Sequence, residues 1–148
     1  MARNDIFIAA SVEDVFALLA DPPSYADWVF GSRDVLSADA GWPRAGAEFE
    51  HRVGVPPLVV QDRTKVLSAS PPRQLVLHAR ARPLPSARIT FHLRPEGNGT
   101  RVTMIEDFEN GLVNLLARPV GHVAIRLRNR ETLRRLKARA EGELLRAA

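Results

Sequence analysis

The pattern of hydrophobic and polar positions divides this chain into one strand, two short helices, a long run of strands and one long helix. Residues 3–10 are predicted to form the first strand, and residues 11–30 the two short helices. Residues 33–109 contain no convincing helical period, whereas residues 119–146 are predicted to form a single Arg-rich helix. A curved antiparallel sheet closed by a C-terminal helix leaves a cavity between the two. The order of elements therefore predicts an α+β domain that binds a small molecule.

Start and stop signals support the two short helices. Ser11 followed by Asp14 is a capping-box-like start, and the Pro-Pro pair at 22–23 ends the first helix because proline cannot continue the hydrogen-bond ladder. Ser24 is predicted to cap the second helix and Gly31 to end it.

Alternation of apolar and polar residues identifies three strands, at 74–82, 87–94 and 101–109. This alternation is typical of an antiparallel sheet with one packed face and one wet face. The connections between these strands are predicted at residues 83–85 and 96–99, which are rich in proline or glycine.

The same alternation places polar side chains on the inner face of the sheet. Glu106 falls on the apolar face of strand 101–109, and His51 falls on the apolar face of strand 48–55. Burying such groups is costly unless they are paired or line a hydrated pocket, so both positions are candidates for a binding site.

Strand 59–67 is harder to orient because both of its faces carry apolar residues. If Val60 points inward, Asp62 and Thr64 do so too, and Lys65 faces water. That register keeps the long cation outside, but a β-bulge within the strand would reverse it.

The C-terminal helix carries an apolar stripe in its second half, made of Leu133, Leu136, Ala140 and Leu144. Continuing this stripe backward at helical spacing reaches Asn129, Arg126 and His122. Either the helix bends, or its first half offers polar groups to the sheet and an apolar side to the second helix or to a partner chain. A monomer and a homodimer are both compatible with this pattern.

Together these patterns predict a set of ligand-binding residues: His51, Asp62, Thr64, Leu77, Phe91, Met104, Glu106, Arg126 and Asn129. As an enzyme, the protein would use His51 to move a proton, Glu106 or Asp62 to orient the imidazole, and Arg126 to stabilise an enolate. The alternative is a buried network of the same residues that only satisfies its own hydrogen bonds. Both interpretations stay open.

Other kinds of site are disfavoured. The chain has no cysteine, and its four histidines have no metal-ligand spacing, so no metal and no cofactor are expected. No serine lies in a GxSxG motif; the serines are interpreted as caps and turns. Residues 41–46 are predicted to form a turn, with Trp42 either at the mouth of the cavity or as a packing lid. The apolar segment 110–119 is interpreted as a gate or a buried loop.

The charge is uneven. Residues 118–146 hold nine basic and three acidic residues, whereas the rest of the chain holds 12 basic and 14 acidic ones. A basic helix can dock on RNA, the ribosome or an anionic membrane, but this helix has no aromatic residue, and a solvated outer face is the better interpretation. Nucleic acid is therefore an unlikely partner.

With no apolar stretch long enough to span a membrane and no signal peptide at its start, the chain is expected to be cytoplasmic. The abundance of Arg and Ala suggests a bacterial source.

Several segments resemble the START-like helix-grip superfamily (SRPBCC, birch-allergen-like), which includes polyketide cyclases/dehydrases and lipid-transport proteins. The segments that carry the resemblance are Ile8–Phe16, Tyr25–Val29, Trp42-Pro43, Pro71–Arg73, Gly99–Thr103 and Asn129–Leu136. The resemblance covers essentially the whole chain, which implies a single domain over residues 1–148. It implies a seven-stranded antiparallel sheet around the long helix, two short helices after the first strand, and a deep hydrophobic cavity.

Members of this superfamily bind lipids, sterols, polyketides or other apolar molecules, and only some are enzymes. The superfamily has no shared catalytic motif to transfer to this chain. The expected function is binding of a small, mostly hydrophobic molecule with a polar group, with His51, Asp62, Glu106 and Arg126 orienting it. The alternatives are a cyclase/dehydratase- or isomerase-type enzyme and, third, a module that docks through its basic helix.

Overall fold

The computed structural model describes residues 1–80, 86–109 and 119–147. Its elements, in chain order, are β1 (Ala2–Ile8), α1 (Val12–Leu19), a 3-10 turn (Pro22–Ser24), α2 (Tyr25–Trp28), β2 (Ser32–Ala38), β3 (Glu48–Val55), β4 (Leu58–Ser70), β5 (Gln74–Arg80), β6 (Ser86–Glu96), β7 (Gly99–Glu109) and α4 (Pro119–Ala147). The predicted connection at 83–85 and all of the predicted segment 110–119 except its last residue lie outside the described residues.

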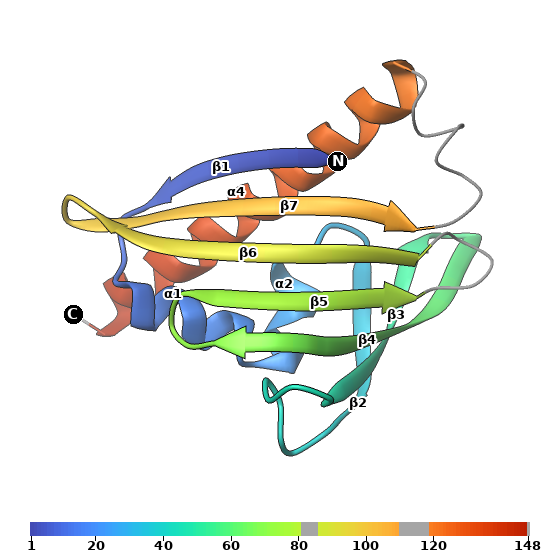
Figure 1. Cartoon of the computed structure of the whole chain (residues 1–148), viewed down its shortest axis with the longest axis horizontal. Coiled ribbons are helices and arrows are strands. Elements are labelled where there is room, and N and C mark those ends of the chain that lie inside the picture. The colour runs from blue at the N-terminus through green and yellow to red at the C-terminus, as the bar shows by residue number, and fades with distance from the viewer. Residues whose placement is uncertain (81–85, 110–118, 148) are drawn as a thin grey trace.

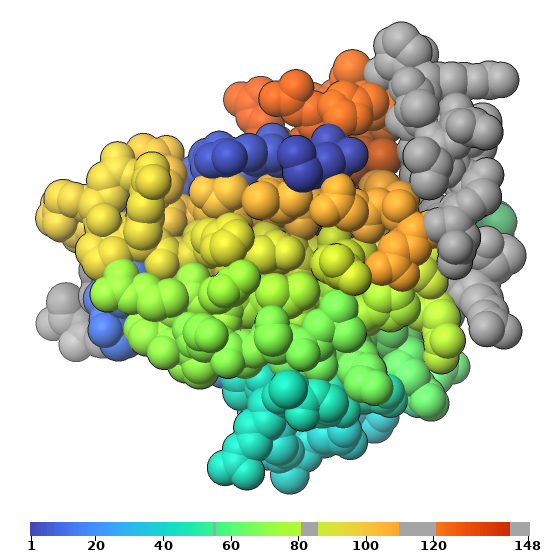
Figure 2. Space-filling model, in the orientation of Figure 1, coloured from blue at the N-terminus to red at the C-terminus, as the bar shows by residue number. Residues whose placement is uncertain are grey.

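The strands form one antiparallel sheet in the order β1-β7-β6-β5-β4-β3-β2 (Figure 1). The long helix α4 lies behind this sheet in Figure 1 and packs against β1 and the two short helices. Figure 2 shows the other face of the sheet, where side chains of β5, β6 and β7 lie side by side in front. The α+β helix-grip fold is therefore confirmed, with its seven-stranded sheet and two short helices after the first strand.

The first short helix is capped as predicted, whereas α2 starts after Ser24 without a side-chain cap, because the Ser24 hydroxyl donates to the Leu18 and Asp21 carbonyls, and it ends at Trp28, before Gly31. The Ser11 hydroxyl accepts a hydrogen bond from the backbone N–H of Asp14 (3.1 Å), which satisfies one of the free donors at the start of α1. The Pro-Pro pair lies in the 3-10 turn after α1. Both helices bury their apolar residues toward the sheet, and Leu19 and Trp28 are fully buried.

Trp42 belongs to the core. It is buried, its ring centroid lies 4.7 Å from that of Phe49, and its indole N–H donates to the Leu19 carbonyl (3.0 Å). It is absent from the cavity lining given below, so the structure supports the packing role and not the position at the cavity mouth.

The register of the sheet follows the predicted parity. Asp62, Thr64 and Val66 of β4 are all buried, and Lys65 between them is exposed, as the inward assignment of this strand requires. The irregularity in the pairing of β4 with β5 falls between Val66 and Ser68, beyond the polar positions. A bulge is thus present but leaves the orientation of Asp62 unchanged.

Candidate ligand-binding cavity

A cavity of about 320 Å³ lies between the inner face of the sheet, α2 and α4. Its walls are largely apolar and include the side chains of Trp28, Phe49, Leu77, Phe91, Met104 and Ile125. Its polar lining comes from His51, Asp62, Thr64, Glu106, Arg128, Asn129 and Thr132. An apolar chamber with a few convergent polar groups is the usual form of a small-molecule site.

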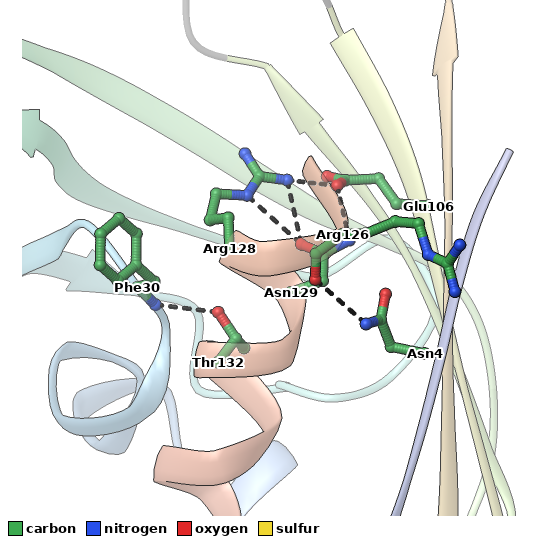
Figure 3. A network of polar contacts seen from close by, with 7 residues as sticks. All are labelled: Asn4, Phe30, Glu106, Arg126, Arg128, Asn129 and Thr132. Carbon is green, nitrogen blue, oxygen red and sulfur yellow. Dashed lines mark hydrogen bonds and ion pairs between the residues drawn. The ribbon is translucent and has the colours of Figure 1, made fainter. Parts of the chain in front are cut away.

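All of the predicted cavity residues except Arg126 line this cavity. Arg126 is exposed, and Figure 3 shows its side chain turned away from Arg128 toward β1, beside Asn4. The buried stripe of α4 continues backward from Asn129 to Ile125, four residues earlier, and Ile125 takes the inner position. The inward placement predicted for Arg126 is therefore wrong, because positions three and four residues away share a helix face and the apolar Ile125 is the one that is buried.

The first polar cluster of the cavity joins three neighbouring strands. The His51 Nε2 lies 2.9 Å from Asp62 Oδ2, and its Nδ1 lies 2.8 Å from the Ser32 hydroxyl. The pairing of β2, β3 and β4 brings these residues together, since His51 stands opposite Asp62 in the register. With a neutral imidazole, Nε2–H donates to the carboxylate and Nδ1 accepts from the serine.

This cluster is closed, because its polar atoms are paired within the protein. The other Asp62 oxygen accepts the backbone N–H of Arg80 (3.0 Å), and the Thr64 hydroxyl lies 3.4 Å from Oδ2. A general base acts on a group within hydrogen-bond reach, and the hydroxyl within reach of His51 belongs to Ser32, which does not line the cavity; the other ring nitrogen is bonded to Asp62. The geometry therefore favours a structural role for His51 in tying the strands together.

The second polar cluster joins β7 to α4 and is shown in Figure 3. The Glu106 Oε1 accepts hydrogen bonds from Arg128 Nη2 and from Asn129 Nδ2, the latter at 3.1 Å. The Asn129 Oδ1 in turn accepts from Arg128 Nε (3.3 Å) and Nη2 (3.2 Å). Glu106 is only 3% exposed, so this ion pair holds a buried carboxylate in an apolar wall.

This second cluster is open. Among the described residues, Glu106 Oε2 and Arg128 Nη1 have no hydrogen-bond partner. Neither atom is sealed off, since Asn4 Oδ1 is the only fully buried, unpaired side-chain polar atom in the described part of the chain. The cluster therefore presents an acceptor and a donor that a ligand can use.

Sequence reasoning missed two residues of these clusters. Ser32 was interpreted as a cap or turn residue, and β2 has no clean alternation that would place it beside His51. The cations of the basic helix are interpreted from the sequence as a solvated outer face, but Arg128 flanks the buried stripe and its long side chain reaches the cavity from the side. One sequence signal could have identified Arg128: it adjoins the inward Asn129, and the inward carboxylate of Glu106 needs a cation nearby.

A phenol in the wall is held neutral. The Tyr25 hydroxyl donates to the Leu19 carbonyl (2.7 Å), and burial, reinforced by the negative charge of Asp21, raises the pKa of Tyr25 far above its ordinary value of 10.0. Tyr25 therefore contributes an apolar ring to the cavity, with its one proton already committed to the backbone.

Docking through the basic helix would depend on its outward cations, and three of its arginines are engaged within the protein. Arg128 turns into the cavity, Arg135 donates to Glu131 (2.9 Å), and Arg139 lies 3.2 Å from Asp27. In the described part of the chain, no helix combines the length and hydrophobicity needed to cross a membrane. Nor do three His, Asp or Glu side chains gather there as metal ligands would.

Residues 2–141 match the family described as polyketide cyclase/dehydrase and lipid transport. No curated protein matches the chain. Solved structures with a similar fold include a protein of Rhodobacter sphaeroides (20% identity, TM-score 0.73, 95% of this chain and 91% of that one) and a protein of Chromobacterium violaceum (19%, 0.72, 94% and 95%). A third is the di-domain ARO/CYC StfQ from the steffimycin biosynthetic pathway (14%, 0.74, 96% of this chain and 50% of that one). At these identities the structures share the fold.

Proposed function

The chain belongs to the polyketide cyclase/dehydrase and lipid transport family, and on this basis we propose that its cavity binds a small, mostly hydrophobic molecule that carries a polar group. The observation that supports this most directly is the apolar chamber of about 320 Å³ with an ion pair in its wall. Removing apolar surface from water provides most of the affinity, at about 25 cal/mol per Å² buried before the costs of association.

A second candidate function is catalysis of the isomerase or cyclase/dehydratase type. One observation favours it: Glu106 presents an oxygen without a partner among the described residues, inside an apolar cavity, where a carboxylate can serve as a general base. In this version Glu106 moves the proton, Arg128 stabilises the developing enolate, and His51 holds the strands. Such an enzyme loses turnover in Glu106→Gln while it keeps its substrate affinity, whereas a carrier has no turnover to lose.

The proposal of binding is tested by filling the cavity. Ala79 lines it on β5, so Ala79→Phe places a ring in the space a ligand would use, whereas Ala138→Phe adds the same ring on the exposed face of α4. We expect native mass spectrometry of protein purified gently from its native host to show an adduct on the order of a few hundred daltons, released on denaturation. The adduct is expected to survive in Ala138→Phe and to be lost in Ala79→Phe. An adduct of equal abundance in both variants would place the ligand elsewhere and contradict the proposal.

A further inference from the structure

We propose that the open cluster of Glu106, Arg128 and Asn129 selects ligands whose polar group is uncharged and both donates and accepts a hydrogen bond, as a primary amide does. This inference rests on the proposed function, because it names the chemical class of molecule that the cavity takes.

The first argument is the count of paired atoms. Glu106 Oε1 already has two donors, and Asn129 accepts from Arg128 through Oδ1 and donates one of its two Nδ2 hydrogens to Glu106. Arg128 donates through Nε and Nη2 to Asn129 and Glu106. Among the described residues this leaves Glu106 Oε2 as an acceptor, and the two N–H groups of Arg128 Nη1 and the second N–H of Asn129 Nδ2 as donors. Neither Oε2 nor Nη1 is sealed off from solvent. A ligand group that pairs both with Oε2 and with one of these N–H groups must carry a donor and an acceptor.

The second argument is charge. Glu106 and Arg128 form a neutral pair, and the other charged residue of the cavity lining, Asp62, has its oxygens committed to His51, Thr64 and the Arg80 backbone. A ligand carboxylate would meet the Glu106 charge, and a ligand ammonium would meet the Arg128 charge. Either would bring one uncompensated charge into an apolar cavity, which is costly. An uncharged donor–acceptor group pairs with Glu106 Oε2 and with a free N–H of the cluster and brings no charge.

The third argument is the contrast between the two clusters. Binding at the closed cluster would require a ligand to displace Ser32 from His51, or His51 or the Arg80 N–H from Asp62. Binding at the open cluster displaces no protein contact. The polar group of the ligand is therefore directed to the β7–α4 side of the cavity.

The test uses four probes that share one compact apolar scaffold. They are adamantane-1-carboxamide, the nearly isosteric 1-acetyladamantane, adamantane-1-carboxylate and 1-adamantylmethylammonium, each titrated calorimetrically into the intact protein. We expect the amide to bind about tenfold more tightly than the ketone, which accepts but cannot donate, and more tightly than either ion. If the ketone binds and the amide gains less than twofold, or if the carboxylate binds best, this inference is overturned while the proposed function stands. If none of the four binds, both are overturned.

Charge changes sharpen the test. Glu106→Gln leaves Arg128 as an unbalanced cation and should shift the preference from the amide toward the carboxylate by at least about tenfold, and Arg128→Gln should shift it toward the ammonium. Glu109→Gln removes the same charge from the same strand, but Glu109 pairs with His78 and Arg88 outside the cavity, so it should leave the order unchanged. An identical shift in Glu106→Gln and Glu109→Gln would overturn the inference. Should either cavity variant fail to fold, the four probes on the native protein still decide.

Discussion

At the scale of single residues, an inward polar side chain of this cavity is informative only when its remaining hydrogen-bonding capacity is known. His51 and Glu106 are both 3% exposed and both line the cavity. His51 has no ring nitrogen to spare, whereas Glu106 keeps one oxygen without a partner in the described residues. Burial and residue type alone would have ranked the histidine first, and its two partners reverse that ranking.

Truncating His51 is expected to cost stability. His51→Ala leaves the buried Asp62 carboxylate without its imidazole partner, and we expect the free energy of unfolding to fall by about 2–4 kcal/mol. Urea denaturation followed by circular dichroism measures this loss. His92→Ala is the matched control, because His92 is exposed on β6, and its effect should stay within about 0.5 kcal/mol. Equal, small effects of the two changes would mean that the closed cluster does not hold the strands together.

The alternation of inward and outward positions along each strand predicted which strand residues line the cavity. The helical period predicted the helix residues less reliably. A strand has only two faces, so one fixed position determines the rest, as the buried Asp62 and Thr64 show. A helix face is broad, and Arg126 and Arg128 differ by two positions on α4. Arg128 reaches the cavity because its side chain is long and because Glu106 lies opposite it. The hydrophobic period of α4 contains neither piece of information, so it could not predict which arginine faces the cavity.

At the scale of elements, α4 is fixed to the end of β1 by a small polar clamp. The Lys137 ammonium donates to the Phe7 carbonyl and to Glu141 Oε1, both at 2.8 Å, and Glu141 accepts the backbone N–H of Ala9 (3.0 Å). The hydrogen bond from Lys137, followed by that from Ala9, lowers the pKa of Glu141 below its ordinary value of 4.5. The clamp therefore depends on an ionised glutamate.

This clamp predicts an acid-sensitive part of the stability. Because the folded-state pKa of Glu141 is depressed, its contribution is fully present above pH 4.5 and is lost as the pH falls through the lowered value. Glu141→Gln should lower the melting temperature at pH 7 and have progressively less effect toward pH 2. Thermal unfolding of both proteins across this range measures the difference. A pH-independent difference for Glu141→Gln would contradict the prediction.

Two glycines should respond oppositely to the same substitution. Gly142 lies within α4, and a Cβ added there meets nothing within 4 Å, so Gly142→Ala should stabilise the protein by about 0.5–1 kcal/mol through helix propensity. Gly99 begins β7 where β1 passes close by, and a Cβ there would lie 2.2 Å from the Ile8 carbonyl oxygen. Gly99→Ala should therefore destabilise by about 2 kcal/mol or more. Chemical denaturation measures both, and a loss of stability in Gly142→Ala would contradict the first.

At the scale of the whole molecule, the order of elements predicted the class of the fold but not the neighbours within the sheet. The hairpins β5–β6 and β6–β7 follow from short connections and alternation. The pairing of β1 with β7 joins the first strand of the chain to the last, and no local pattern specifies it. The volume of the cavity is likewise a property of the assembled sheet and helices.

The two tryptophans allow cavity occupancy to be read without a label. Trp28 lines the cavity and Trp42 does not, and the chain has no others. In Trp42→Phe, titration with 1-acetyladamantane should change the emission of Trp28 and raise the melting temperature, by the equivalent of about 2.7 kcal/mol at a hundredfold excess over Kd. In Trp28→Phe the remaining Trp42 emission should stay constant. An equal response of both tryptophans would indicate a global change instead of occupancy.

The pairing of the first strand with the last also sets an order for assembly on the ribosome. The partners of β1 run from Thr100, opposite Ile8, to Glu106, opposite Ala2, so they are synthesised about a hundred residues later. At roughly 5–20 residues per second, the nascent β1 waits about 5–20 s for a strand to join. Ile8, fully buried in the finished protein, is apolar and unprotected throughout that interval. The strand that is made first is therefore among the last to enter the sheet, and chaperone binding to the nascent chain is expected to concentrate on it.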